Sequence, residues 1–304
     1  MQCCRLSKGE YETLKCRIAV GIPTIGRAAI LAETLRELGR QTRQPDQVLV
    51  CGASEADFTG AAEAMPSVKL LVSPAGLPRQ RNAILKELAN VDIVVFFDDD
   101  FLPLPNYLEV VERHMTQDPG IVVSTGRVLA DGIGGPGLTL EQARAILSQA
   151  ATGADAVLPT FSGYGCNMAL RVDAMLAHGV TFDERLPLYG WQEDVDACRR
   201  LAPFGSVVQL TAACGVHLGA KSGRGSGVRL GYSQVANPLY LAGKGNGYPF
   251  TRALSHLTCN VAMNLVRAPF PESYLDRRGR LLGNMLAARD LMMGRMTPER
   301  VLEL

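Results

Sequence analysis

The order of apolar and polar positions predicts strands and helices that alternate along most of the chain. Short, almost wholly apolar runs are typical of strands buried on both faces of a sheet. Such runs fall at residues 16–22, 47–51, 68–72, 93–97, 121–128 and 205–210. Helical spacing of apolar residues follows at 30–38, 79–89, 103–117, 140–151, 171–178 and 195–201. The repeated order of strand, turn and helix predicts an α/β fold, with a mostly parallel central sheet and helices on both faces.

The last quarter of the chain has a different pattern, because helical spacing replaces the strand-like runs. Residues 252–267 carry an apolar stripe, and a further helix is expected over 280–293. We therefore expect an N-terminal extension over residues 1–15, an α/β domain over 16–226 and a mainly helical C-terminal extension over 227–304. No apolar run reaches the ~18 residues of a spanning helix, and the first residues lack the apolar core of a signal peptide.

The most informative stretch is the run 93–97, which stops abruptly at Asp98, Asp99 and Asp100. In open α/β sheets, ligands bind at the carboxyl ends of the strands. Three adjacent carboxylates repel one another unless a cation or strong donors lie between them. Hard oxygen ligands at this edge suit Mg²⁺ or Mn²⁺ bridging phosphates. The alternative is a solvated acidic turn that caps the next helix.

Composition adds limits to this picture. The 304 residues carry a formal net charge of +1, so overall charge does not suggest a nucleic-acid partner. Residues 221–304 hold 12 Lys/Arg and 5 Asp/Glu, a local charge of +7. That segment could face phosphates, an anionic membrane or an acidic partner. The eight cysteines form no CxxC pair, and several lie in apolar runs, which favours reduced thiols of a cytoplasmic protein.

Several motifs occur in an order that is more specific than any one of them. They are Ile22-Pro23-Thr24 with Arg27, Arg81-Asn82-Ala83, Asp98-Asp99-Asp100, Gly165-Cys166-Asn167, Glu193-Asp194-Val195-Asp196, Arg199-Arg200-Leu201 and His217. In this order, over roughly residues 17–226, the chain resembles a family 2 glycosyltransferase of the GT-A fold.

The resemblance implies a metal-dependent, inverting glycosyltransferase that moves a sugar from a nucleotide-diphosphate sugar to a hydroxyl of a saccharide or lipid-linked acceptor. It also implies a role in surface polysaccharide or glycoconjugate assembly. Asp100, Asp98 and His217 would bind a divalent cation, Mn²⁺ or Mg²⁺, although the run of three acids also permits Asp99 as a ligand. Asp194 would be the base that removes the acceptor proton, with Glu193 orienting it or binding the acceptor.

The resemblance also assigns residues to the donor and the acceptor. The donor would be bound by Pro23, Thr24, Arg27, Ser54, Arg81, Asp98, Asp99, Gly165, Asn167, Lys221 and Arg224. The acceptor would be bound by Trp191 and Tyr164. Family members often carry an aspartate after the second strand, whereas this chain has Ala53-Ser54 there. No donor base is therefore assigned.

Two other classes of function remain open. A sugar nucleotidyltransferase would share the nucleotide-binding sheet and the metal, and a catalytically silent nucleotide-sugar-binding protein would share the fold. The basic C-terminal extension has three candidate roles: completing the acceptor site, pairing two protomers, or lying on an anionic membrane at the inner face.

Overall fold

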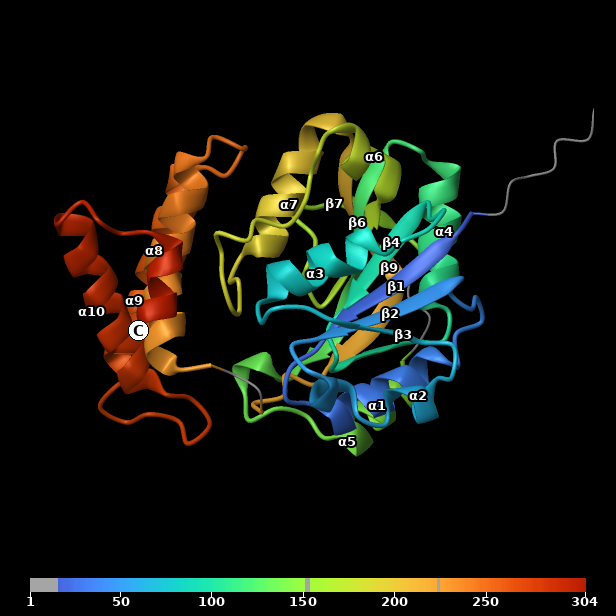
Figure 1. The fold of residues 1–304 in the computed structure, drawn as a ribbon, viewed down its shortest axis with the longest axis horizontal. Helices are drawn as coiled ribbons and strands as arrows, with labels where there is room; N and C mark the ends of the chain where they lie inside the picture. Colours follow the sequence, from blue (N-terminus) through green and yellow to red (C-terminus); the bar gives the residue numbers. More distant parts are fainter. Residues whose placement is uncertain (1–15, 151–153, 223–224) are drawn as a thin grey trace, which may run out of the picture.

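The computed structural model describes residues 16–150, 154–222 and 225–304, and its first half forms a parallel sheet. The strands are β1 (Ile18–Pro23), β2 (Gln47–Gly52), β3 (Lys69–Val72) and β4 (Ile93–Phe97). They lie in the order β3-β2-β1-β4, and every pairing among them is parallel (Figure 1). Their carboxyl ends therefore share one edge, where the acid triplet follows β4.

The second half of the chain extends the same sheet beyond β4. Its strands are β5 (Phe101–Pro103), β6 (Ile121–Asp131), β7 (Val157–Pro159), β8 (Asn167–Arg171) and β9 (Ser206–His217). The strand β8 pairs antiparallel with β4 and β6, while β6 and β9 are parallel; β5 and β7 pair antiparallel with β9. Six of the nine strands thus run in one direction, which confirms the predicted mostly parallel α/β sheet.

Helices cover both faces of the sheet. They are α1 (Ala28–Leu38), α2 (Ala61–Ala64), α3 (Leu77–Lys86), α4 (Tyr107–Gln117), α5 (Leu140–Ser148), α6 (Val172–Ala177) and α7 (Glu193–Leu201). Alternate residues of β1 enter two cores: Ile18 and Val20 pack in the core with α1 and α4, whereas Ala19 packs in the core with α3 and α7. This is why the strand reads as a continuous apolar run.

The C-terminal residues form a helical layer beside the sheet domain (Figure 1). It consists of α8 (Gly227–Gly243), α9 (Phe250–Arg267), α10 (Arg277–Met292) and the short 3-10 helix η4 (Pro298–Glu303). The layer has a small core of its own around Tyr232, Val235 and Ala287. Glycines let α8 and α10 approach closely, since a Cβ on Gly231 would lie 2.0 Å from the carbonyl oxygen of Arg280. No helix of the described ranges is long and apolar enough to cross a membrane.

The predicted elements agree with the structure to within a few residues, but three strands and two α-helices were missed. The short strands β5, β7 and β8 and the helices α2 and α8 were not predicted. Two boundaries also differ. The strand predicted over 205–210 continues to His217, and the helix predicted from residue 103 begins at Tyr107 because the preceding residues form β5.

Candidate active site

Four strand ends bring the candidate residues together at one edge of the sheet. The acid triplet connects β4 to β5, and Phe101 at the start of β5 is the register partner of His217 at the end of β9. That pairing carries His217 back to residues that lie more than a hundred positions earlier in the sequence. The β6–β9 pairing then places Asp131 opposite His217.

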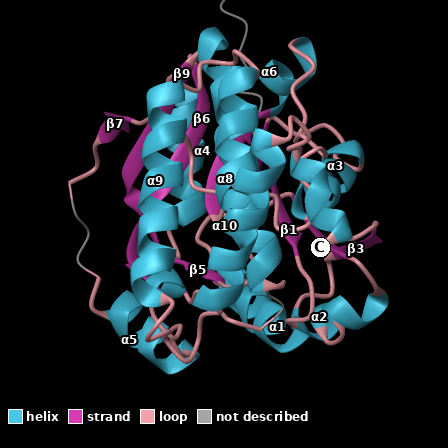
Figure 2. Cartoon of the chain, turned by 90° about the vertical axis from the view of Figure 1, so that its left-hand side faces the viewer, coloured by secondary structure: helices cyan, strands magenta, loops and turns pink. Residues whose placement is uncertain are grey.

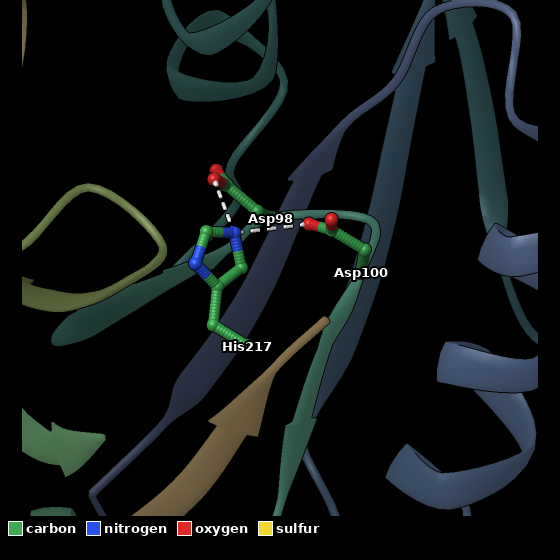
Figure 3. A group of neighbouring side chains, drawn as sticks. All are labelled: Asp98, Asp100 and His217. Carbon is green, nitrogen blue, oxygen red and sulfur yellow. Dashed lines mark ion pairs between the residues drawn. The ribbon is translucent and has the colours of Figure 1, made fainter. Parts of the chain in front are cut away.

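Asp98, Asp100 and His217 form a group that could hold a divalent cation (Figure 3). One atom from each residue lies within 4.8 Å of the other two. The imidazole Nε2 of His217 is 3.3 Å from Asp100 Oδ1 and 3.9 Å from Asp98 Oδ2. Asp100 Oδ1 is buried and lies beside the His217 ring. Two carboxylates and an imidazole are a donor set that suits Mn²⁺ or Mg²⁺, so the residues present fit the predicted cofactor.

The ring of His217 is oriented by Asp131, a residue that the sequence did not single out. Asp131 Oδ1 lies 2.9 Å from Nδ1 of the imidazole, and the hydroxyl of Tyr164 donates to Asp131 Oδ2 at 2.9 Å. Burial alone would lower the pKa of His217, but hydrogen bonds with Asp100 and Asp131 raise that pKa to about 10. Carboxylate support on one imidazole nitrogen is typical of histidines that bind metals through the other.

Asp99 has different partners from Asp98 and Asp100 and does not belong to the group around His217. The carboxylate of Asp99 is fully buried, accepts a hydrogen bond from Thr24 Oγ1 at 2.7 Å and pairs with Arg27 Nη2 at 2.8 Å. It therefore joins the β1–α1 turn to the acid triplet. Asp100 Oδ2 is held by the Ala220 N–H at 2.8 Å and by Arg27 at 3.3 Å, which leaves Oδ1 for the group around His217. Burial raises the pKa of Asp99.

The predicted catalytic pair lies at the first turn of α7. Glu193 is buried and forms an ion pair with Arg81. Asp194 accepts hydrogen bonds from the backbone N–H groups of Gly165 and Val195, each at 2.8 Å. Burial raises the pKa of both carboxyl groups, to about 8 for Glu193. Perturbed carboxyl groups at a ligand-binding edge are candidates for acid–base chemistry.

Arg81 connects this pair to the metal-binding group. Its side chain is fully buried, and Nη2 lies 2.7 Å from the carbonyl oxygen of Gly165 and 3.4 Å from Asp98 Oδ1. Its other terminal nitrogen pairs with Glu193. The resemblance assigns Arg81 to the donor, and in the structure its side chain contacts two carboxylates, those of Asp98 and Glu193.

The turn after β2 contains a second residue that the sequence overlooked. Ser54 is exposed and begins the 3-10 helix η1 (Glu55–Phe58). The side chain of Asp57 accepts hydrogen bonds from the backbone N–H groups of Gly26, Ala53 and Ser54 at 2.7–2.9 Å. Asp57 thus ties two strand-end turns together. The sequence offered one signal for Asp57: it is an acid three residues after Ser54, which is the spacing of a capping box.

Two predicted site residues lie on β1 and β8, the strands on either side of β4. Pro23 ends β1 and is buried opposite Cys51. Asn167 begins β8, is fully buried and accepts a hydrogen bond from Thr125 Oγ1 at 2.6 Å, whereas its side-chain nitrogen has no partner. Gly165 just before it allows a close approach, because a Cβ there would lie 3.1 Å from Asp194 Oδ2.

The remaining predicted residues border the C-terminal layer. The ring of Trp191 contacts His256 of α9, with centroids 6.2 Å apart, and its carbonyl oxygen accepts a hydrogen bond from Asn237 of α8. Lys221 donates to the carbonyl oxygens of Gly132 and Ile133 at 3.1 and 2.9 Å. The predicted donor-binding residue Arg224 lies outside the described residues.

Comparisons with known proteins agree with this arrangement. Three solved structures share the fold, although their sequences are only distantly similar. The mannosyltransferase PcManGT from Pyrobaculum calidifontis, solved with GDP-Man and Mn²⁺, has a TM-score of 0.55 at 17% identity, over 95% of this chain and 86% of that chain. S. aureus TarS 1-349 has a TM-score of 0.55 at 16% identity, over 94% of this chain and 82% of that chain. GalNAc-T7, solved with UDP, GalNAc and Mn²⁺, has a TM-score of 0.53 at 12% identity, over 86% of this chain and 59% of that chain. No curated protein sequence matches the chain.

The curled sheet, the helices around it and the acid-lined edge define a glycosyltransferase of the GT-A fold. The chain belongs to glycosyl transferase family 2, whose family model matches residues 19–176, or 158 of the 304 residues. The resemblance that the motifs suggested is therefore confirmed, and so is the class of enzyme.

Proposed function

We propose that the chain is a metal-dependent, inverting glycosyltransferase that moves a sugar from a nucleotide-diphosphate sugar to a hydroxyl group of a saccharide or lipid-linked acceptor. The observation that carries this proposal is the contact of Arg81 with both Asp98 and Glu193. That contact places a carboxylate pair suited to deprotonating an acceptor next to a group suited to holding a diphosphate-bound cation.

The donor side of the site is formed by the strand-end turns. We infer that Asp98, Asp100 and His217 hold the cation, while Thr24, Arg27 and Asp99 fix the turn beside it. When bound there, a divalent cation offsets the charge of the departing diphosphate. One structural neighbour was solved with GDP-Man and Mn²⁺ and another with UDP, GalNAc and Mn²⁺, which supports a nucleotide-diphosphate sugar and a divalent cation for this chain as well.

The acceptor side is formed by α7 and the loop before it. We infer that Asp194 takes the proton of the acceptor hydroxyl at a carboxylate oxygen while that hydroxyl attacks the anomeric carbon. A bond forms between the acceptor oxygen and the sugar, the bond from the sugar to the diphosphate breaks, and its electron pair leaves with the diphosphate. A single displacement inverts the anomeric centre. Glu193, paired with Arg81, positions Asp194, and Trp191 and Tyr164 would bind the acceptor.

These contacts also suggest different roles for the sheet domain and the C-terminal layer. We infer that residues 16–226 carry the chemistry and that residues 227–304 shape the acceptor side, because Asn237 and His256 both contact Trp191. The N-terminal extension expected over residues 1–15 lies outside the described residues. A cytoplasmic location and a role in surface polysaccharide or glycoconjugate assembly complete the proposal. In support of the location, the six cysteines within the described ranges are free thiols.

Product analysis tests the proposal. Purified chain is first screened by thermal shift with nucleoside diphosphates and Mn²⁺ or Mg²⁺, because a bound ligand stabilises the folded state by RT ln(1 + [L]/Kd). The matching nucleotide sugar is then incubated with saccharide and lipid-linked acceptors. We expect release of a nucleoside diphosphate that depends on the cation. Release of pyrophosphate from a nucleoside triphosphate and a sugar phosphate would instead identify a nucleotidyltransferase, and metal-dependent binding without turnover would identify a silent binding protein.

A further inference from the structure

The C-terminal layer holds most of the large hydrophobic residues that are exposed in the described chain. Of the 19 large hydrophobic residues that are exposed in the described ranges, 11 lie between residues 250 and 293. Seven of the 19 are exposed by 60% or more, and six of these belong to that segment: Phe250, Leu265, Val266, Phe270, Met292 and Met293. Large apolar patches on a folded surface mark places where something else binds.

These side chains come from elements that lie on one side of the molecule. Figure 2 looks at the side that is on the left in Figure 1, and it shows α8, α9 and α10 in front of the sheet. Phe270 lies in the connection between α9 and α10 and is 87% exposed, the largest value among the exposed hydrophobic residues. Val266 near the end of α9 is 71% exposed, and Met292 at the end of α10 is 81% exposed. The exposed apolar residues of α9 and α10 therefore belong to the outer layer of the fold.

The charges on the same segment are almost all positive. Between residues 250 and 295, five arginines and a single acid are exposed, and no lysine is present. The exposed arginines are Arg252, Arg267, Arg278, Arg289 and Arg295, and the exposed acid is Asp276. Arg252 lies over the Phe161 ring of the sheet domain and Arg295 pairs with Asp290, so Arg267, Arg278 and Arg289 are the main charges of the outer face. Asp276 is already engaged, since its side chain accepts the Gly279 N–H at the start of α10. The surface is therefore both apolar and cationic.

On α10 the two kinds of side chain share one stripe. Arg278, Leu282, Met285, Arg289 and Met292 follow one another at spacings of four, three, four and three residues, and all five are exposed. Residues at these spacings lie along one face of a helix. A helix face that combines apolar side chains with arginines is suited to the boundary between lipid headgroups and acyl chains.

We propose that the outer face of α9, α10 and their connection is a docking surface for an anionic lipid bilayer, on which the enzyme lies without crossing it. Anionic headgroups complement the arginines, and the apolar side chains enter the acyl boundary. A second copy of the chain is a poorer match, because a two-fold contact places the same face against itself and so brings arginines toward arginines. The proposal does not use the residues assigned to the chemistry, and it stands whether or not the sugar-transfer mechanism is right.

Vesicle binding tests this surface directly. The full chain is mixed with vesicles of neutral phosphatidylcholine, or of phosphatidylcholine with 30% phosphatidylglycerol, and the bound fraction is measured by flotation. We expect binding to the anionic vesicles and at least tenfold weaker binding to the neutral ones. Because the binding depends on arginines of α9 and α10, raising the salt concentration should weaken the anionic binding.

Two sets of variants assign the binding to the proposed residues. The triple variant Val266→Ser, Phe270→Ser, Met292→Gln should bind anionic vesicles at least about tenfold more weakly, since it removes three apolar side chains. Leu176→Gln is its control, because Leu176 is 77% exposed on α6 in the sheet domain. The double variant Arg267→Gln, Arg289→Gln should lose about fivefold for each arginine. Its control is Arg36→Gln, Arg40→Gln, which removes two exposed arginines around the end of α1.

Folding is checked separately by circular dichroism and by thermal shift with nucleotide, and both should be unchanged because the substituted side chains are exposed. Equal binding to neutral and anionic vesicles would overturn the proposal, and so would variants that bind like the wild type. A stable dimer by light scattering that the triple variant converts to a monomer, with no vesicle binding, would show that a second copy occupies the face instead.

Discussion

Asp131 and His217 face each other as register partners on β6 and β9, and Asp131 Oδ1 lies 2.9 Å from the imidazole Nδ1. The contact leaves Nε2 directed toward Asp98 and Asp100 (Figure 3). Removing the support should therefore weaken metal binding without removing a metal ligand. We expect Asp131→Ala to lower Mn²⁺ affinity by about 10- to 100-fold, measured by electron paramagnetic resonance of free Mn²⁺. Tyr164→Phe removes only the hydrogen bond to Asp131, so its effect should be much smaller. Unchanged affinity in Asp131→Ala would contradict the positioning role.

The three consecutive aspartates should differ sharply in their response to the same substitution. Asp100→Asn should abolish measurable Mn²⁺ binding, because Oδ1 of Asp100 lies in the group around His217. Asp99→Asn should largely retain Mn²⁺ binding, because the Asp99 carboxylate is occupied by Thr24 and Arg27. It should lower stability instead, by about 1–3 kcal/mol, as expected for a weakened buried charge pair. Calorimetric titration with Mn²⁺ and urea unfolding separate the two effects. Equal loss of metal binding in both variants would mean that the metal ligands are wrongly assigned among the three aspartates.

Asp194→Asn should keep donor binding and lose transfer. An amide cannot accept the acceptor's proton, and loss of a general base costs about 10²–10⁴-fold in rate. The substitution also preserves size, so the site should stay folded. Nucleotide release and thermal shift with the donor, on the same preparation, give the two readouts. Wild-type turnover in Asp194→Asn would exclude it as the base.

The pH dependence of transfer should reflect the burial of that base. Asp194 acts in its charged form, so the rate falls as pH falls through its pKa. Because burial raises this pKa, the fall should begin at a higher pH than for an exposed aspartate, whose pKa is about 3.9. The profile of kcat/KM against pH, taken with saturating cation, measures the midpoint. A profile that stays flat down to the ordinary aspartate range would contradict this expectation.

Arg81 should be critical for stability as well as for activity. In Arg81→Met, Glu193 is left buried without its partner, and breaking a buried pair in this way costs about 3–5 kcal/mol. The double variant Arg81→Met, Glu193→Gln removes both charges and should recover part of the loss. Urea unfolding of the single and double variants above pH 8, where Glu193 is charged, measures the difference. A double variant less stable than the single one would show that the charge pair is not the source of the loss.

Glu193 should also make stability depend on pH. Its folded-state pKa of about 8 is above the ordinary value, so the folded protein holds this proton more tightly than the unfolded chain. The stabilisation is complete below the unfolded-state pKa, about 4.3, and is lost as pH rises through about 8. The free energy of unfolding should therefore decrease across this interval, and Glu193→Gln should remove that part of the slope.

The sequence predicts the fold and the centre of the site because both depend on local order. Apolar runs locate the strands, and the carboxyl end of a buried strand locates Asp98 and Asp100. The roles of Asp131 and Asp57 could not be predicted in the same way. Asp131 acquires its role from a partner 86 positions away, and Asp57 from the Gly26 N–H on another turn.

The C-terminal layer shows a second limit of sequence patterns. Helical spacing groups Leu254, Leu257, Val261 and Leu265 in one stripe, which predicts a helix with an apolar face. In the structure Leu257 and Val261 pack against the layer's core, whereas Leu254 and Leu265 are exposed. Periodicity indicates which residues share a helix face, but it does not indicate how much of that face is buried by packing.

The pairing of Asp131 with His217 has a consequence for how this enzyme can change over generations. Three register shifts occur between β6 and β9 before the strands reach these two residues. Side chains alternate across a strand, so a slip of one residue beyond the last shift turns one partner to the opposite face. A single-codon deletion there would separate the carboxylate from the imidazole even though neither residue had mutated. Insertions and deletions should therefore be tolerated in the turns that precede β6 and β9 and selected against in the last few residues of these strands.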